Sequence, residues 1–226
     1  MTLLDYPGKV AAIIFTAGCN FRCPFCYNPD FVLPEKLKET MKDLIPEKAF
    51  FNFLEKRKEF LEGIVICGGE PTIQKDLYDF VKKIKSFGLL IKLDTNGQDP
   101  EILKKLIDEN LVDYVAMDIK DSLENYELSG IKNLDMKPYL ESIKILMEGK
   151  VDYEFRTTII QGHHTKAKIE QIAKAIKGAK KYCLQNFEGK GKLLDPDFKG
   201  KRFTKKELEA MKEIVLRYVE ICEIRT

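Results

Sequence analysis

Residues 64–94 of this chain read IVICGGEPTIQKDLYDFVKKIKSFGLLIKLD, and this stretch indicates the fold class. It contains two short apolar runs, Ile64–Cys67 and Leu89–Leu93, whose lengths favour buried strands. Between them, residues 74–87 repeat apolar side chains with helical spacing, and Gly88 is a typical helix stop. A helix that connects two buried strands predicts a β–α–β unit, in which the strands run parallel.

The same alternation continues along the rest of the chain. Four further apolar runs predict strands at residues 10–15, 112–117, 153–160 and 181–185. Helical patterns lie at residues 46–59, 100–107, 136–148 and 166–177, and a last helix opens at a capping box, Thr204–Glu207, and continues to bury Cys222. Six strands alternating with helices predict an α/β fold with a parallel sheet and right-handed crossovers, in the form of a partial (β/α)6 barrel.

Size and composition fit one globular domain. The chain has 226 residues, of which 44% are hydrophobic and 33% charged, and its formal net charge is +2. We predict a single domain over residues 1–226, with a core at about 2–187 and a C-terminal loop and helix at about 188–226. The small net charge argues against a nucleic-acid partner. No apolar run reaches the length of a membrane span, and residues 1–9 lack a secretory signal, so we expect a cytoplasmic protein.

Three cysteines follow the first predicted strand within eight residues. Cys19, Cys23 and Cys26 are separated by three and two residues, and the next cysteine in the sequence is Cys67. In the reducing cytoplasm, clustered cysteines are metal ligands more often than disulfides. A 4Fe–4S cluster ordinarily takes four thiolates, so three nearby thiolates would leave one iron open to a small molecule. Structural zinc, with Cys67 as the fourth ligand, is the alternative.

Three further polar clusters fall where predicted strands end. Gly68-Gly69-Glu70-Pro71 follows the second strand, Asp94-Thr95-Asn96-Gly97 ends the third, and Met117-Asp118-Ile119-Lys120 ends the fourth. In β/α barrels the active site forms from the loops after the strands. We therefore expect these clusters and the cysteines to share one rim and one site.

Each cluster has a chemical rationale. Gly68 and Gly69 lack a Cβ and would let the backbone approach a ligand, and Glu70 could pair with a cationic group on it. Asp94 and Asp118 could bind a cation or a hydroxyl group. Lys120 could hold a carboxylate, and so could Arg156, a charge inside the fifth strand that needs a partner if it is buried.

Each of these residues could also have a purely structural role. Asp118 and Lys120 could form an internal ion pair, and Asp94-Thr95-Asn96-Gly97 alone would be a turn. Gln185 and Asn186 at the sixth strand end could touch a ligand or serve as simple caps. His163 and His164, which follow the fifth strand, are expected to be solvated loop residues.

Together, the cysteine motif with Phe25 before its third cysteine and the Gly68-Gly69-Glu70-Pro71 stretch resemble the radical S-adenosylmethionine enzymes. The stretches Asp5-Tyr6-Pro7-Gly8 and 14–30 look like the activating enzymes of glycyl radical enzymes, most of all the activators of anaerobic ribonucleoside-triphosphate reductase and, next, of pyruvate formate-lyase. Tyr27 departs from this pattern, which often has His after the third cysteine. The resemblance covers roughly residues 2–187 and implies the partial barrel.

The resemblance also implies roles for the site residues. Cys19, Cys23 and Cys26 would bind three irons of a 4Fe–4S cluster, and the fourth iron would chelate S-adenosylmethionine. Phe25 would lie near the adenine, and Glu70, with Gly68 and Gly69, would meet the amino group. Lys120 and Arg156 would contact the cofactor, and Asp94, Thr95 and Asp118 would form a monovalent cation site.

The implied reaction is a reductive cleavage of S-adenosylmethionine. A reduced cluster would yield a 5′-deoxyadenosyl radical, which would abstract hydrogen from a glycine of a partner glycyl radical enzyme. An electron donor such as flavodoxin or ferredoxin would feed the cluster. The alternative is a radical enzyme that acts on a small molecule, like the compact enzymes of deazapurine synthesis. A closed polar pocket would favour that alternative, and an open groove would favour a protein substrate.

Overall fold

The computed structural model describes residues 2–124 and 126–226; Met1 and Asn125, both within the predicted domain 1–226, lie outside the described residues. Seven parallel strands form one sheet, and they lie side by side in their order along the chain. The strands are β1 (Ala11–Thr16), β2 (Gly63–Gly68), β3 (Leu90–Thr95), β4 (Tyr114–Asp118), β5 (Asp152–Ile159), β6 (Lys181–Asn186) and β7 (Ile221–Arg225).

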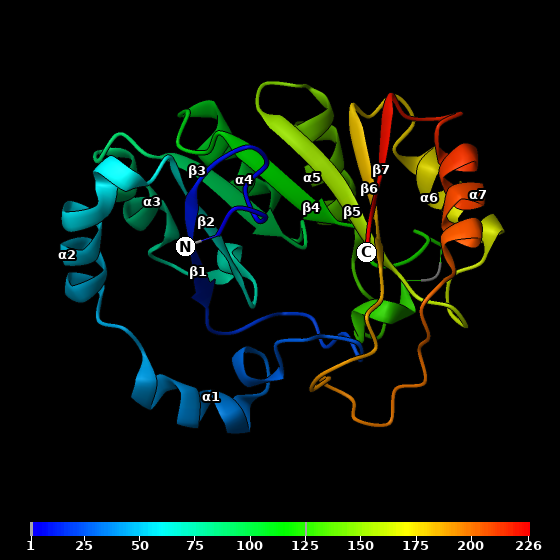
Figure 1. Cartoon of the computed structure of the whole chain (residues 1–226), viewed down its shortest axis with the longest axis horizontal. Helices are drawn as coiled ribbons and strands as arrows, with labels where there is room; N and C mark the ends of the chain where they lie inside the picture. Colours follow the sequence, from blue (N-terminus) through cyan, green and yellow to red (C-terminus); the bar gives the residue numbers. More distant parts are fainter. Residues whose placement is uncertain (1, 125) are drawn as a thin grey trace.

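The helices are α1 (Pro34–Thr40), α2 (Glu47–Arg57), α3 (Leu77–Lys85), α4 (Pro100–Asp108), α5 (Met136–Met147), α6 (Lys166–Ala175) and α7 (Lys205–Val215). Helices α2 to α7 lie around the outside of the curved sheet, with α2 and α3 at one end and α6 and α7 at the other, whereas α1 lies apart from it (Figure 1). Their starts follow the expected chemistry. Asp99 caps α4 just before Pro100, and Thr204 and Glu207 complete the predicted capping box of α7.

The predicted fold class is confirmed, and the predicted C-terminus is corrected. Helix α7 ends at Val215, and Cys222 belongs to a seventh strand rather than to that helix. Cys222 pairs in register with Tyr182 of β6. The spacing of buried residues from Leu208 to Cys222 also suits a helix, so the sequence alone does not reveal that the edge of β6 was available for pairing.

The sheet does not close. Strands β1 and β7 lie at opposite ends of the strand order, and each pairs with a single neighbouring strand. The described part of the N-terminus adds one antiparallel bridge, Thr2 to Ala11, on the free edge of β1. The architecture is therefore a partial barrel with seven strands, one more than predicted.

The two faces of the sheet differ in chemistry. Ile64, Ile66 and Leu93 belong to the main apolar core, which also includes the buried faces of the helices. Val65, on the other face, belongs to a separate small cluster. Because side chains alternate along a strand, Glu154 and Arg156 of β5 lie on one face together, where they form ion pairs. Among the described residues, no helix has both the length and the apolar character that a membrane span requires.

Candidate active site

A cavity of about 240 Å³ lies at the carboxyl ends of the strands and collects side chains from the predicted clusters. Its lining includes the cysteine loop and the ends of β2, β3, β4 and β5. The predicted residues on this lining are Cys19, Cys23, Phe25, Cys26, Gly68, Gly69, Glu70, Asp94, Asp118, Lys120 and Arg156. All of these predicted site residues therefore share one cavity, because the carboxyl ends of parallel strands meet at one edge of the sheet.

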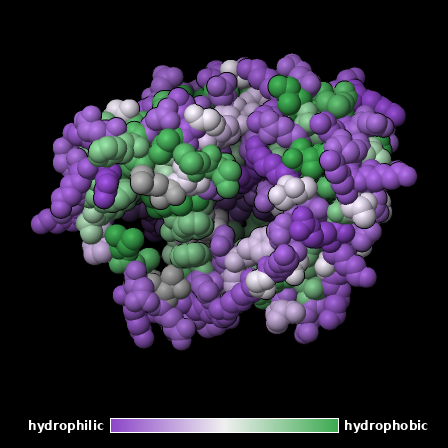
Figure 2. Space-filling view, viewed as in Figure 1, coloured by the Kyte–Doolittle hydropathy of each residue, from purple (hydrophilic) through white to green (hydrophobic). Residues whose placement is uncertain are grey.

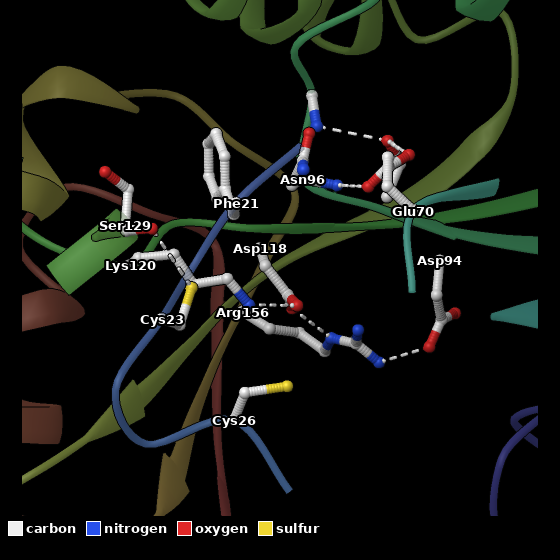
Figure 3. A network of polar contacts seen from close by, with 12 residues as sticks. Phe21, Cys23, Cys26, Glu70, Asp94, Asn96, Asp118, Lys120, Ser129 and Arg156 are labelled. Atoms are coloured by element: carbon white, nitrogen blue, oxygen red, sulfur yellow. Dashed lines mark hydrogen bonds and ion pairs between the residues drawn. The ribbon is translucent and has the colours of Figure 1, made fainter. Parts of the chain in front are cut away.

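The three cysteines sit on one loop, and each thiol has a backbone partner. Cys19 Sγ accepts from the N–H of Phe21 at 3.3 Å, and Cys26 Sγ accepts from the N–H of Asn28 at 3.4 Å. The Cys23 thiol donates to the Ser129 carbonyl at 3.8 Å (Figure 3). Burial raises the pKa of Cys19 to about 11 and that of Cys23 to about 12. These two thiols are therefore protonated at neutral pH unless a bound cation stabilises the thiolates.

The glycine pair brings the end of β2 against the cysteine loop. A Cβ on Gly69 would lie 1.9 Å from the carbonyl oxygen of Gly18, and Gly68 has a φ of +108°. The N–H of Glu70 donates to that same Gly18 carbonyl at 2.8 Å. The missing side chains thus permit a close approach between two backbones, as well as the predicted approach to a ligand.

Glu70 is buried, and its carboxylate connects the loop after β2 to the end of β3 and to the loop that follows β3. Its Oε1 accepts from the N–H and the hydroxyl of Thr72 and from the hydroxyl of Thr95, and its Oε2 accepts from the N–H of Asn96 at 2.6 Å. Burial raises the pKa of this carboxyl even though these donors oppose the shift. Figure 3 shows it aimed at the loop after β3. Its observed contacts hold the loop, and a contact with a cofactor amino group stays a prediction.

A chain of alternating charges crosses the cavity floor. The Arg156 guanidinium donates from Nε to Asp118 at 2.8 Å and from an Nη to Asp94 at 2.9 Å, as Figure 3 shows. Lys120 Nζ binds Asp118 at 2.7 Å, and Lys92 pairs with Asp94. The internal ion pair between Asp118 and Lys120 is therefore present, as one of the two interpretations of the sequence predicts.

The charge of this network fits an anionic ligand. Burial opposes ionisation of Asp118, but Arg156 and Lys120 overcome it and hold the pKa of Asp118 well below its usual range. Two carboxylates and three cations leave one excess positive charge. The guanidinium has five N–H donors and the ammonium has three, so the contacts with Asp94 and Asp118 do not use them all.

Phe25 is buried in the cavity wall, and the Lys120 ammonium lies 6.0 Å from its ring centre. Thr158, Gln185 and Asn28 also line this cavity, and the sequence analysis missed them or left them undecided. Thr158 follows Arg156 by two residues and so shares its face of β5, a signal that could have found it. Gln185 lines the cavity, whereas Asn186 exchanges two hydrogen bonds with the Phe203 backbone and is a structural cap. Asn28 also lines the cavity, but no pattern in the sequence indicates this.

The prediction that both histidines are solvated is wrong for His164. This residue is buried; its Nδ1 accepts from the N–H of Ile160 at 3.0 Å, and its Nε2 lies 3.2 Å from the carbonyl oxygen of Lys120. The first contact makes Nε2 the protonated nitrogen, so the ring is neutral and donates to Lys120. Burial lowers the pKa of His164 to about 4. His164 thus ties the loop after β5 to the loop after β4.

The donor set fits an iron–sulfur cluster with an open iron. Among the described residues, no three Cys, His, Asp or Glu side chains are gathered around a common point as metal ligands are. The three loop thiols nevertheless line one cavity, and two of them have raised pKa values that a bound cation would relieve. Cys67 also lines it, but it belongs to β2 rather than to the loop.

Comparison with known proteins agrees with the site. Residues 13–176 match the Radical SAM superfamily. A Methanocaldococcus jannaschii protein provisionally assigned as a glycyl-radical enzyme activating enzyme is 35% identical over 100% of this chain and 93% of its own length. The pyruvate formate-lyase-activating enzyme of Clostridium pasteurianum is 26% identical over 95% of each chain.

A solved structure shares the fold. Streptococcus suis SuiB bound to S-adenosylmethionine superposes with a TM-score of 0.72 over 96% of this chain and 50% of its own, at 16% identity. That likeness concerns the fold alone. The family match and the full-length relative, together with three cysteines on one loop at the strand ends, establish that this chain is a radical SAM enzyme of the glycyl-radical enzyme activating group.

Proposed function

We propose that this enzyme uses S-adenosylmethionine to abstract hydrogen from a glycine of a partner glycyl radical enzyme, and that the partner is anaerobic ribonucleoside-triphosphate reductase. The observation that carries the proposal is the single cavity that joins three cysteines of one loop to the charged ends of β3, β4 and β5. The likeness of residues 14–30 to activators of that reductase supports this partner.

When bound, the cluster and S-adenosylmethionine supply the one-electron cleavage that yields a 5′-deoxyadenosyl radical. Cys19, Cys23 and Cys26 would hold the cluster. The remaining N–H donors of Lys120 and Arg156 would bind and orient the cofactor carboxylate. Phe25 would lie against the adenine. The buried wall around these groups would exclude water from the reactive species.

The shape of the molecule favours a protein substrate over the small-molecule alternative. A second hollow of about 1110 Å³ lies beside β1, the edge strand of the unclosed sheet. Apolar side chains of β1, α2 and α3 contribute to its wall, and Figure 2 shows hydrophobic residues gathered around a hollow on this face. An open hollow of this size, whose wall also includes charged side chains such as Lys36 and Glu39, suits a segment of a protein better than a small metabolite.

The decisive experiment is anaerobic. The protein would be reconstituted with iron and sulfide, reduced, supplied with S-adenosylmethionine, and assayed for 5′-deoxyadenosine beside a Cys19→Ala control. Product that depends on Cys19 supports the radical chemistry. The reduced enzyme would then be mixed with anaerobic ribonucleotide reductase or with pyruvate formate-lyase. A glycyl radical spectrum only with the reductase supports the partner, and a spectrum only with the lyase contradicts it.

Two finer proposals belong to the same site. A flavodoxin or ferredoxin would deliver the electron to the cluster. Replacing the chemical reductant with either protein in the same assay would test this proposal. A monovalent cation would sit at Asp94, Thr95 and Asp118, although both carboxylates already contact protein cations. If that site operates, potassium should raise the affinity for S-adenosylmethionine, and Asp118→Asn should remove the effect. No potassium effect on the unmodified enzyme would count against it.

A further inference from the structure

The segment after β6 crosses the cysteine loop. We call residues 187–203 the strap; from residue 188 on they belong to the predicted C-terminal loop, and they lie beyond the residues 13–176 that match the superfamily. In Figure 1 the strap is the orange stretch that descends from β6 beside the blue loop after β1. The strap's backbone donates three hydrogen bonds to that loop: Glu188 N to Tyr27 Oη at 2.8 Å, Leu194 N to Cys26 O at 3.0 Å, and Asp195 N to Pro24 O at 3.0 Å.

Aromatic packing joins the same two segments. The Tyr27 ring stacks on Phe187 with centres 5.8 Å apart. Phe198, further along the strap, lies 6.1 Å from Phe25 and 5.9 Å from Phe187. Phe25 and Tyr27 flank Cys26 in the sequence, so the strap grips the loop on both sides of the third cysteine.

Both ends of the strap are fixed to the barrel, and at its start the N–H of Phe187 donates to the carbonyl of Ile159 at 3.1 Å. Phe203 exchanges two hydrogen bonds with Asn186, at 2.9 and 3.0 Å. Lys201 forms a backbone bridge with Gln161, at 2.9 and 3.3 Å. A segment held at its ends and bonded at its centre has little freedom, so its contacts can limit the movement of the loop beneath it.

We propose that Tyr27 is a positioning residue, which locks the strap onto the cysteine loop and thereby fixes Cys26 for cluster binding. Its hydroxyl accepts the first of the three backbone bonds, and its ring supplies the stacking contact. Cys26 itself is held through its carbonyl by the next bond along the strap. This inference rests on the proposed role of Cys26 as a cluster ligand, and it assigns a task to the residue that departs from the family pattern.

The test compares two tyrosine-to-phenylalanine variants of the full chain. Tyr27→Phe keeps the ring and removes only the acceptor for Glu188 N. Tyr218→Phe is the matched control, since its hydroxyl donates to Glu170 at 2.6 Å, remote from the cysteine loop. The proteins would be reconstituted anaerobically, and the release of iron to ferrozine would be timed. In parallel, the apoproteins would be treated with iodoacetamide and the alkylation of each cysteine followed by mass spectrometry.

We expect Tyr27→Phe to release iron roughly fivefold faster than the unmodified protein, as the loss of one neutral hydrogen bond would allow. Alkylation of Cys26 should accelerate similarly, while buried Cys183 provides an internal reference. Tyr218→Phe should match the unmodified protein in both assays. Equal iron release and equal Cys26 alkylation in the two variants would overturn the inference. If the unmodified protein incorporates no cluster, the proposed function fails, and the alkylation rates alone decide the role of Tyr27.

Discussion

Two polar networks lie on the same face of the sheet, two residues apart on β5, and they are built differently. Arg156 bridges Asp94 and Asp118 at the cavity, and each of these carboxylates has a lysine as a second partner. In the second network, the single carboxylate of Glu154 binds two cations. Arg225 binds it through both oxygens at 2.7 Å, and Lys181 lies at 3.5 Å.

The difference shows that the Arg156 network is suited to bind a ligand, whereas the Glu154 network stabilises the fold. The Glu154 carboxylate is fully buried and also faces the Tyr114 hydroxyl at 3.1 Å, so its acceptor capacity is used within the protein. Because Arg225 belongs to β7, this network attaches the last strand to β5. The Arg156 network borders the cavity and keeps donors and positive charge for a ligand. Removal of residues from the two networks should therefore have opposite consequences.

The largest effect is expected from Cys23→Ala. Loss of one of three cluster ligands should abolish 5′-deoxyadenosine formation, a decrease of at least about 1000-fold. The melting temperature of the apoprotein should change little, since alanine keeps the buried position apolar and the lost hydrogen bond to Ser129 is long, at 3.8 Å. Product assays and calorimetry would check this. Turnover near that of the unmodified enzyme would remove Cys23 from the site.

Glu154→Gln should destabilise the fold by about 2–3 kcal/mol, because two cations would lose their shared counter-charge. Affinity for S-adenosylmethionine should stay unchanged. Urea unfolding and calorimetric titration would measure the two quantities. Glu223→Gln is the control, since Glu223 pairs with the same cations but is partly exposed, and it should cost less than about 1 kcal/mol. Similar losses of unfolding free energy in both variants would contradict the structural role of Glu154.

His164 predicts a pH dependence of stability. Its folded pKa of about 4 lies below the ordinary value of 6.5, so the unfolded chain binds the proton first as the pH falls. Stability should be complete above pH 6.5 and fall by up to about 3 kcal/mol on approach to pH 4. Urea unfolding across this range should show the loss. His164→Gln should flatten the curve; identical curves for this variant and the unmodified protein would assign the loss to other groups.

The smallest expected effect tests the site network directly. Arg156→Gln should weaken binding of S-adenosylmethionine about tenfold through the loss of one charged partner. Stability should fall less than in Glu154→Gln, because Asp94 and Asp118 each keep a lysine as a partner. Arg225→Gln should show the reverse pattern. Equal binding by Arg156→Gln and the unmodified enzyme would mean that the ligand carboxylate lies elsewhere.

The residues that sequence reasoning found were those with a local signal. The cysteine spacing, the Gly68-Gly69-Glu70-Pro71 stretch and the polar ends of the third and fourth strands each depend on neighbours in the chain. His164 and Tyr27 were missed or left unassigned because their partners, Lys120 and Glu188, are distant in the sequence. The burial of His164 depends on a contact between two loops that no periodicity predicts.

The sequence by itself determined the α/β class, the order of the first six strands, the caps of α4 and α7 and the strand ends that form the site, since these follow from periodicity, capping chemistry and the rule that parallel strands end at one edge. Only the tertiary structure decided that residues 221–225 pair with β6, that Glu70 binds the loop after β3, and that the strap lies on the cysteine loop. Those outcomes depend on which unpaired edge or donor lies nearby in space, and a linear pattern carries no such information.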